Sequence, residues 1–102
     1  MATDLRADTS WLIADIGATS TRCATCCASS RRIDELKIFQ NEQFDSLDGL
    51  LGSYLSSVGT KPAAAALAIA GPIDGDDIQM TNRNWQFNRR ELAERLRLEP
   101  LI

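Results

Sequence analysis

An aspartate and a run of small, hydroxyl-bearing residues follow a short apolar segment near the start of the chain. Residues 14–22 are Ala-Asp-Ile-Gly-Ala-Thr-Ser-Thr-Arg. The backbone N–H groups and hydroxyls of such a turn are donors for phosphate oxygens, and Gly17 lets backbone approach a bulky anion. A carboxylate at a strand end suits hydrated Mg²⁺, which prefers carboxylate, water and phosphate oxygens. Taken alone, this stretch predicts with equal weight a phosphate-binding turn or an ordinary hairpin with a polar turn.

The turn belongs to neither of the two common phosphate-binding patterns. It lacks the lysine-containing pattern of a Walker A loop and the three glycines of a dinucleotide-binding turn. Two further segments follow downstream, LAIAGPIDGD at 67–76 and MTNRNWQF at 80–87, and they change how the turn is interpreted. Together with DIGATSTR at 15–22, they resemble the bacterial glucokinase family of the hexokinase, Hsp70 and actin superfamily. The resemblance extends over nearly the whole chain from Trp11.

This resemblance implies transfer of the ATP γ-phosphoryl group to the 6-hydroxyl of glucose, with Mg²⁺ as the metal. Asp15 is implied to orient the hydrated Mg²⁺ through water, and the turn to hold the β and γ phosphates. Arg22 is expected either to offset charge near the turn or to form a surface ion pair. The residues implied to bind phosphate and Mg²⁺ are Ala14, Asp15, Ile16, Gly17, Ala18, Thr19 and Thr21.

The turn departs from the family pattern at two positions. The family commonly has glycine at the position of Ala18 and asparagine at that of Ser20. If that glycine has a positive φ angle, alanine is expected to cost about 1 kcal/mol. Ser20 keeps a hydrogen-bonding group, so we expect a milder effect there.

Two residues are implied to lie at the sugar cleft. Asn82 is a candidate sugar ligand because an amide both donates and accepts hydrogen bonds. It also suits a turn-capping role, which is slightly favoured. Trp85 is expected either to close over the sugar or to fill the core of the domain, and the core is favoured.

Four segments have the pattern of strands. Residues 11–16, 21–28 and 35–40 are predicted to form an antiparallel meander, with 11–16 inside the sheet because it is apolar on both faces. Residues 64–70 are predicted to be a buried strand parallel to 11–16, since a helical segment separates the two. In the third strand, Leu36, Ile38 and Gln40 are expected on one face and Lys37 and Phe39 on the other.

Apolar residues at helical spacing predict a helix over 46–58, capped by Asp45 or Ser46. A second helix is predicted from the cap Asn88 to about Leu96. A mixed sheet with helices packed on it is an α/β fold, and the family resemblance implies the ribonuclease H-like small domain of actin- and hexokinase-like ATPases.

Composition excludes several classes of function. The net charge is −3 without a basic cluster, which argues against nucleic-acid binding, and no apolar run reaches the length of a membrane span. The first residues lack a signal-peptide core, so a cytoplasmic location is expected. The chain has no histidine, and its cysteines, Cys23, Cys26 and Cys27, are expected to be reduced thiols of a strand rather than a redox or metal site.

We expect residues 1–10 to be flexible and 11–102 to form the N-terminal small domain of a glucokinase, incomplete at its C-terminal end. In the family, the strand that follows ends in an Asn-Asp pair at the sugar. The resemblance therefore implies that the general-base aspartate lies beyond Ile102, that no catalytic residue lies within the chain, and that the chain alone is inactive.

Other classes of function remain alternatives. One is a non-enzymatic sugar- or nucleotide-binding module of the same superfamily, although no helix-turn-helix precedes Trp11. Another is a ligand-free interaction piece. The implied partners are the small molecules glucose and ATP, without nucleic acid or membrane, and homodimerisation is left open.

Overall fold

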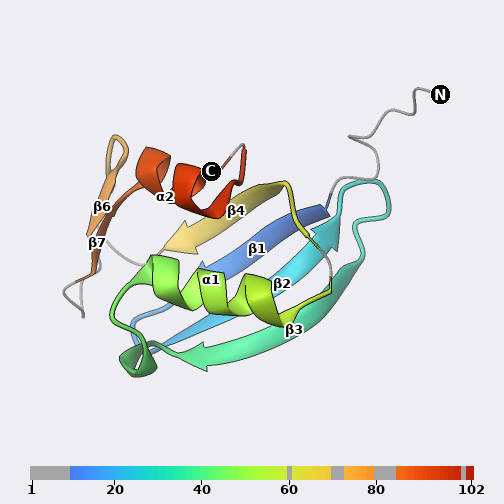
Figure 1. The fold of residues 1–102 in the computed structure, drawn as a ribbon, viewed down its shortest axis with the longest axis horizontal. Helices are drawn as coiled ribbons and strands as arrows, with labels where there is room; N and C mark the ends of the chain where they lie inside the picture. The colour runs from blue at the N-terminus through green and yellow to red at the C-terminus, as the bar shows by residue number, and fades with distance from the viewer. Residues whose placement is uncertain (1–9, 60, 70–72, 80–84, 100) are drawn as a thin grey trace.

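The computed structural model of the 102-residue chain describes residues 10–59, 61–69, 73–79, 85–99 and 101–102. A four-stranded mixed sheet lies against two helices, and a small three-stranded sheet lies beside the second helix (Figure 1). The expected flexible segment 1–10 lies outside the described residues, apart from Ser10, which begins the first strand. The elements in chain order are β1 (Ser10–Ile16), β2 (Ser20–Cys27), β3 (Ile33–Gln40), the 3₁₀ helix η1 (Asn41–Gln43), α1 (Leu47–Ser57), β4 (Ala64–Ile69), β5 (Ile73–Asp74), β6 (Asp77–Gln79), β7 (Gln86–Asn88) and α2 (Arg89–Leu96).

The larger sheet has the strand order β3-β2-β1-β4. β1 pairs with β2 in antiparallel register from Ser10–Cys27 to Ile16–Thr21, and β4 runs parallel to β1. β2 also pairs antiparallel with β3, but the register shifts between Cys23 and Thr25. The interior position of β1 and the direction of β4 agree with the sequence-based prediction.

The shift in register explains why β3 begins at Ile33, two residues before its predicted start. Opposite the shift, Glu35 has a φ of 58°, which is the left-handed conformation typical of a bulged residue. The bulge lets β3 continue past Glu35 until Ile33 pairs with Cys26. The alternation of apolar residues in the sequence does not indicate a bulge of this kind.

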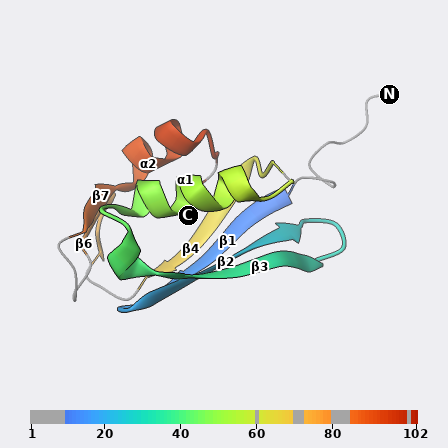
Figure 2. The ribbon, with the colours of Figure 1, turned by 60° about the horizontal axis from the view of Figure 1, so that its bottom comes forward.

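Both helices lie on one side of the sheet, which we call the covered face (Figure 2). α1 contributes the predicted apolar stripe, of which Leu47, Leu50, Leu51 and Tyr54 are buried. Ser46 caps the helix, because its side chain accepts a hydrogen bond from the Gly49 N–H at 3.1 Å. These contacts confirm the predicted helix and one of its two candidate caps.

The opposite side, which we call the open face, carries Ile13, Asp15, Arg22, Leu36 and Ile38. No helix of the described residues lies over it (Figure 2). Side chains in a strand alternate between faces, so Leu12, Ala14 and Ile16 of β1 enter the core while Ile13 and Asp15 do not. Ile33, Leu36 and Ile38 of β3 are 59%, 61% and 58% exposed.

α2 is held in place by its cap and by ion pairs. The Asn88 side chain accepts hydrogen bonds from the N–H groups of Arg90 and Glu91, as predicted. Asp76 in the turn between β5 and β6 pairs with Arg89 and Arg90, at 2.7 and 2.8 Å. This arrangement ties the small sheet to the start of α2.

A second ion pair, between Arg95 and Asp48, joins α2 to α1. Past the helix, Leu101 forms a parallel bridge with Ala65 of β4. The end of the chain therefore lies alongside the outer edge of β4. Neither helix of the described residues has the length and apolar character that a membrane span requires.

Candidate functional site

The candidate phosphate loop, residues 17–19, connects β1 to β2 at one end of the larger sheet. β1 and the parallel strand β4 both end there, with Ile16 opposite Ile69. η1 lies at the same end (Figure 1). Ligands of α/β proteins bind beyond the carboxyl ends of parallel strands, so the loop occupies a favourable position.

Gly17 allows the loop to close tightly on itself. Its N–H donates to the Ser20 carbonyl oxygen at 2.9 Å. A Cβ atom at this position would lie 3.0 Å from the same oxygen, closer than side chains normally come to backbone. The loop's own carbonyl therefore favours glycine here, a reason that differs from the predicted approach of an anion.

The outer part of the loop presents its amides. Ala18 and Thr19 are exposed. Within the described residues, their backbone N–H groups meet no hydrogen-bond acceptor. Successive free N–H groups in a turn make a concave site for anions, so the loop can bind phosphate oxygens without a lysine.

Ala18 fits this loop without backbone strain. The described non-glycine residues with positive φ are Arg31, Glu35 and Arg97, and Ala18 is not among them. The cost of about 1 kcal/mol expected for alanine in place of glycine presupposes a positive φ. That condition is not met here, so we expect no such cost.

Asn41, the first residue of η1, holds the loop from inside. It is fully buried. Its Nδ2 donates to the Gly17 carbonyl at 2.9 Å and its backbone N–H donates to the Thr19 carbonyl at 2.9 Å. Sequence analysis missed this residue, because it lies 24 positions from Gly17 and only the pairing of β2 with β3 brings the two together.

Thr21 differs from its expected role as an exposed phosphate donor. Its side chain is fully buried on the covered face. Its hydroxyl donates to Asn41 Oδ1 at 2.7 Å. The hydroxyl hydrogen is therefore engaged in the fold, and the alternation of β2 explains why: Thr21 shares the inward side with Cys23.

Asp15 lies at the exposed end of β1, on the open face. Its strand neighbours Ala14 and Ile16 are buried, so only their backbone groups are available to a ligand. Arg22 is the cross-strand neighbour of Asp15 and is also exposed. Both line a shallow hollow of about 460 Å³ on the open face. No ion pair links the two within the described part of the chain.

The single carboxylate of Asp15 fits a hydrated ion better than a chelated one. In the portion of the chain that the structure describes, no three acidic, histidine or cysteine side chains gather into a metal site. An ion held by one carboxylate keeps most of its waters, which is the usual behaviour of Mg²⁺ bound with a nucleotide. The geometry is therefore compatible with the predicted water-mediated role.

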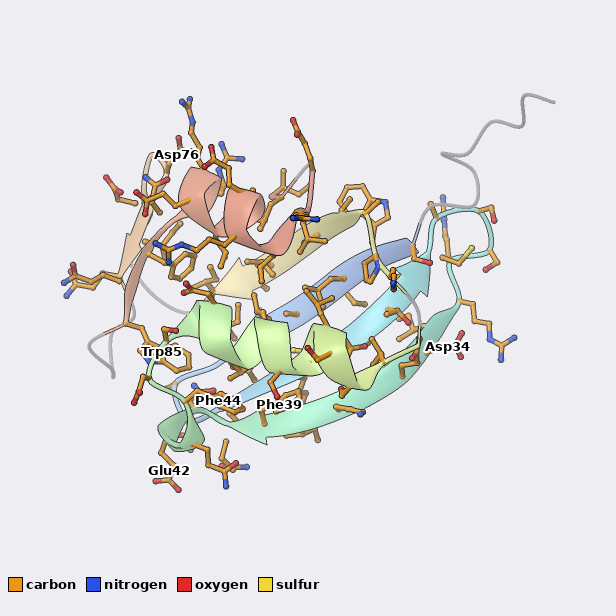
Figure 3. All side chains as sticks on the ribbon, viewed as in Figure 1. Asp34, Phe39, Glu42, Phe44, Asp76 and Trp85 are labelled. Atoms are coloured by element: carbon orange, nitrogen blue, oxygen red, sulfur yellow. The ribbon has the colours of Figure 1, made fainter. Side chains whose placement is uncertain are left out.

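Of the two candidate sugar residues, the structure describes only Trp85. Asn82 lies outside the described residues. Trp85 is 5% exposed and belongs to the hydrophobic core. Figure 3 shows it where the chain enters β7, toward the first turn of α1. Its side chain fills the core, which was the favoured alternative, and is not presented to a cleft.

The three cysteines are free thiols in different surroundings. Cys23 is buried on the covered face, and burial raises its pKa to about 12. Cys27, at the end of β2, has a pKa lowered to about 7, first by the Ser29 side chain, whose hydroxyl lies 3.3 Å from its Sγ. The thiols were expected to be buried and reduced; Cys23 is buried, whereas Cys26 and Cys27 are only half-buried.

Comparison with known proteins gives one consistent result. A family model described as Glucokinase matches residues 12–102. Among curated relatives, the chain is 33% identical over 90 residues to a glucokinase of Tolumonas auensis and 38% identical over 90 residues to one of Photorhabdus laumondii. In each case the match covers 88% of this chain and 28% of the relative. The chain thus spans a little over a quarter of their length.

Two solved glucokinase structures superimpose on this chain. A glucokinase from an Antarctic psychrotroph superimposes with a TM-score of 0.81 at 34% identity, over 90% of this chain and 30% of that one. A glucokinase from Balamuthia mandrillaris, solved in complex with glucose, superimposes with a TM-score of 0.63 over 92% of this chain and 29% of that one. At 23% identity, the second comparison supports the fold alone.

Proposed function

The chain belongs to the glucokinase family, and we propose that residues 11–102 form the small N-terminal domain of an enzyme that transfers the γ-phosphoryl group of ATP to the 6-hydroxyl of glucose. The observation that carries this proposal is the family match over residues 12–102. We further propose that the domain has the ribonuclease H-like fold of actin- and hexokinase-like ATPases. The mixed order β3-β2-β1-β4, with a crossover from β3 through α1 to β4, supports this assignment.

In this proposal, the loop after β1 binds the β and γ phosphates of ATP. The exposed N–H groups of Ala18 and Thr19 donate to phosphate oxygens, and Gly17 permits the tight closure that turns them outward. Thr21 supports the loop from the core. Phosphoryl transfer depends mainly on positioning and on stabilising charge, and a rigid set of donors supplies both.

Asp15 is proposed to orient Mg²⁺ through its bound waters. When bound with ATP, the ion offsets the negative charge of the phosphates. Asp15 is suited to this role because it is exposed at the end of β1, next to the loop. Arg22 lies across the strand from it and adds positive charge to the same end of the open face.

The remainder of the active site is proposed to come from parts of the family outside the matched segment, which is 28% of the length of the curated relatives. These include the general-base aspartate, placed beyond Ile102, and further sugar ligands beside Asn82. Because the substrates are ATP and glucose, we place the enzyme in the cytoplasm. Homodimerisation is a further part of the proposal that rests on the family alone.

The alternative of a non-enzymatic binding module is less well supported. The two curated relatives described above and the structure from the Antarctic psychrotroph are glucokinases. A sensing module would bind sugar or nucleotide without turnover, so a glucose-dependent ADP-release assay separates the two. The assay requires the product of the whole reading frame that contains residues 1–102.

The sharpest test of the site is Asp15→Ala in that whole enzyme. We expect a fall in kcat of about 100-fold, because the Mg²⁺ that offsets the charge of the phosphates loses the carboxylate that orients it. Glu94→Ala, which removes an exposed carboxylate from α2, is the matched control and is expected to leave kcat unchanged. Equal rates for wild type and Asp15→Ala would contradict the assigned role, and absence of ATP-dependent glucose phosphorylation in the wild type would overturn the proposed function.

A further inference from the structure

Asn41 and Thr21 form a buried polar pair behind the candidate phosphate loop. Both side chains are fully buried, in a region otherwise lined by the apolar core. A buried amide and a buried hydroxyl are costly unless they are hydrogen-bonded, and here each bonds to the other. The hydrogen bonds therefore offset a desolvation cost that apolar residues at these positions would not have.

The hydrogen bonds of this pair can run in one direction only. The Gly17 carbonyl oxygen can only accept, so the amide group of Asn41 must face it with Nδ2. That leaves Asn41 Oδ1 toward Thr21, whose hydroxyl must then donate. The Gly17 carbonyl thus fixes which way the Asn41 amide faces, and the Thr21 hydroxyl anchors that amide by donating to its oxygen.

The result is a loop whose carbonyl and amide groups are separated. The carbonyls of Gly17 and Thr19 are both directed to Asn41, one to its side chain and one to its backbone N–H. The Ser20 carbonyl accepts from Gly17 N–H. Because these three oxygens are engaged in hydrogen bonds within the loop and with Asn41, they are kept from an incoming phosphate that meets the amides of Ala18 and Thr19.

The geometry points to Asn41, anchored by Thr21, as a positioning residue that presents the loop amides to the phosphates of ATP. This inference rests on the proposed function and adds a residue from η1 to the phosphate site. Asn41 touches no reacting atom in this role. Its effect should therefore fall on the nucleotide and not on the sugar.

The test compares two identical substitutions on the same strand of the whole enzyme. Thr21→Val removes the hydroxyl that anchors the Asn41 amide oxygen, at nearly constant shape. Thr25→Val is the control: Thr25 is also buried on β2, and its hydroxyl bonds instead to Glu35 and the Asp34 carbonyl at the far end of the strand. KM for ATP, KM for glucose and resistance to urea are measured for both.

We expect Thr21→Val to raise KM for ATP about tenfold, the equivalent of one lost hydrogen bond, with KM for glucose within about twofold of wild type. Asn41→Asp should have a larger effect, because a carboxylate cannot donate to Gly17 and repels phosphate. Thr25→Val should leave both KM values unchanged, whatever it does to stability. In the 102-residue chain, amide exchange at Gly17 and Asn41 should accelerate in Thr21→Val only.

Equal effects of Thr21→Val and Thr25→Val on KM for ATP, in an active enzyme, would overturn the positioning role and leave the proposed function intact. A wild-type enzyme without glucose phosphorylation would overturn the proposed function, and this inference with it. If Thr21→Val does not fold, Thr21→Ser and Thr21→Ala make the same comparison, since only serine keeps the hydroxyl. A KM for ATP that is equal in these two variants would also overturn the inference.

Discussion

Side chains on the two faces of the four-stranded sheet meet different surroundings. On the covered face, Leu12, Ile16 and Cys23 are completely buried beneath the helices. On the open face, Leu36 and Ile38 are about 60% exposed, although they are as apolar as the residues of the core. Adjacent residues of one strand therefore experience opposite environments.

The difference shows what strand alternation determines and what it leaves undetermined. Alternation places Leu12 and Ile13 on opposite sides of β1. Which side becomes the core depends on the crossover from β3 through α1 to β4, which passes over one face only. Stability should accordingly depend on the covered face, while the open face should contribute less to stability and more to association.

The largest expected effect concerns the thiols at the middle and the end of β2. The continuous register with β1 places Cys23 and Cys27 on the same side of the strand, but only Cys23 lies under the helices. At pH 7 a thiol with a pKa of about 7 is about half ionised, whereas one with a pKa of about 12 is ionised to about one part in 10⁵. We expect iodoacetamide to label Cys27 with a midpoint near pH 7 and to leave Cys23 unlabelled.

Peptide mapping by mass spectrometry after a short pulse of reagent measures both sites. Because the thiolate is the reactive form, labelling of Cys27 should rise as pH increases through its pKa and fall below it. Urea should remove the difference, since unfolding exposes Cys23. Rapid labelling of Cys23 in the native chain would show that the covered face opens readily.

The second prediction compares neighbouring residues of β1. Leu12→Ala removes a fully buried side chain and should lower the free energy of unfolding by about 2–5 kcal/mol. Ile13→Ala, on the open face, removes a half-buried side chain and should cost less than half as much. Urea denaturation followed by tryptophan fluorescence gives both values, and equal losses would show that the open face is as well packed as the covered one.

The same contrast explains which features could be predicted from the sequence. Period and composition identify β1, β2, α1 and β4 because each has a regular pattern and its own cap or turn residues. The bulge at Glu35 and the burial of Asn41 could not be predicted, because both depend on how β2 and β3 pair across many residues. For Trp85 the sequence allowed a place in the core or at the sugar cleft and favoured the core. Its burial depends on packing that spans α1 and β7.

In the candidate site, the sequence predicts the loop and Asp15 but not what holds the loop. Small residues and a carboxylate after an apolar strand are a local pattern. Thr21 belongs to the same local pattern and was expected to face the ligand. The predicted strand 21–28 already contained Thr21, and alternation puts Thr21 on the same face as Cys23. Alternation alone does not show which face the helices cover, and the burial of both residues identifies it.

The smallest expected effect on stability comes from the open face itself. Ile38→Lys replaces a side chain that is 58% exposed, so the free energy of unfolding should change by no more than about 0.5 kcal/mol. We expect the isolated chain to self-associate, because Ile33, Leu36 and Ile38 form exposed apolar surface on an edge strand. Sedimentation velocity over a range of concentrations measures association for the wild type and the variant.

Ser56→Lys is the matched control, because it adds the same charge to an exposed position of α1, on the other side of the molecule. Each variant changes the net charge from −3 toward zero, which by itself favours association. Weaker association in Ile38→Lys alone would therefore act against the charge effect and identify apolar contact on the open face as the cause. Equal association in the two variants would remove the distinction between the faces in solution, and stability would then remain the property in which they differ.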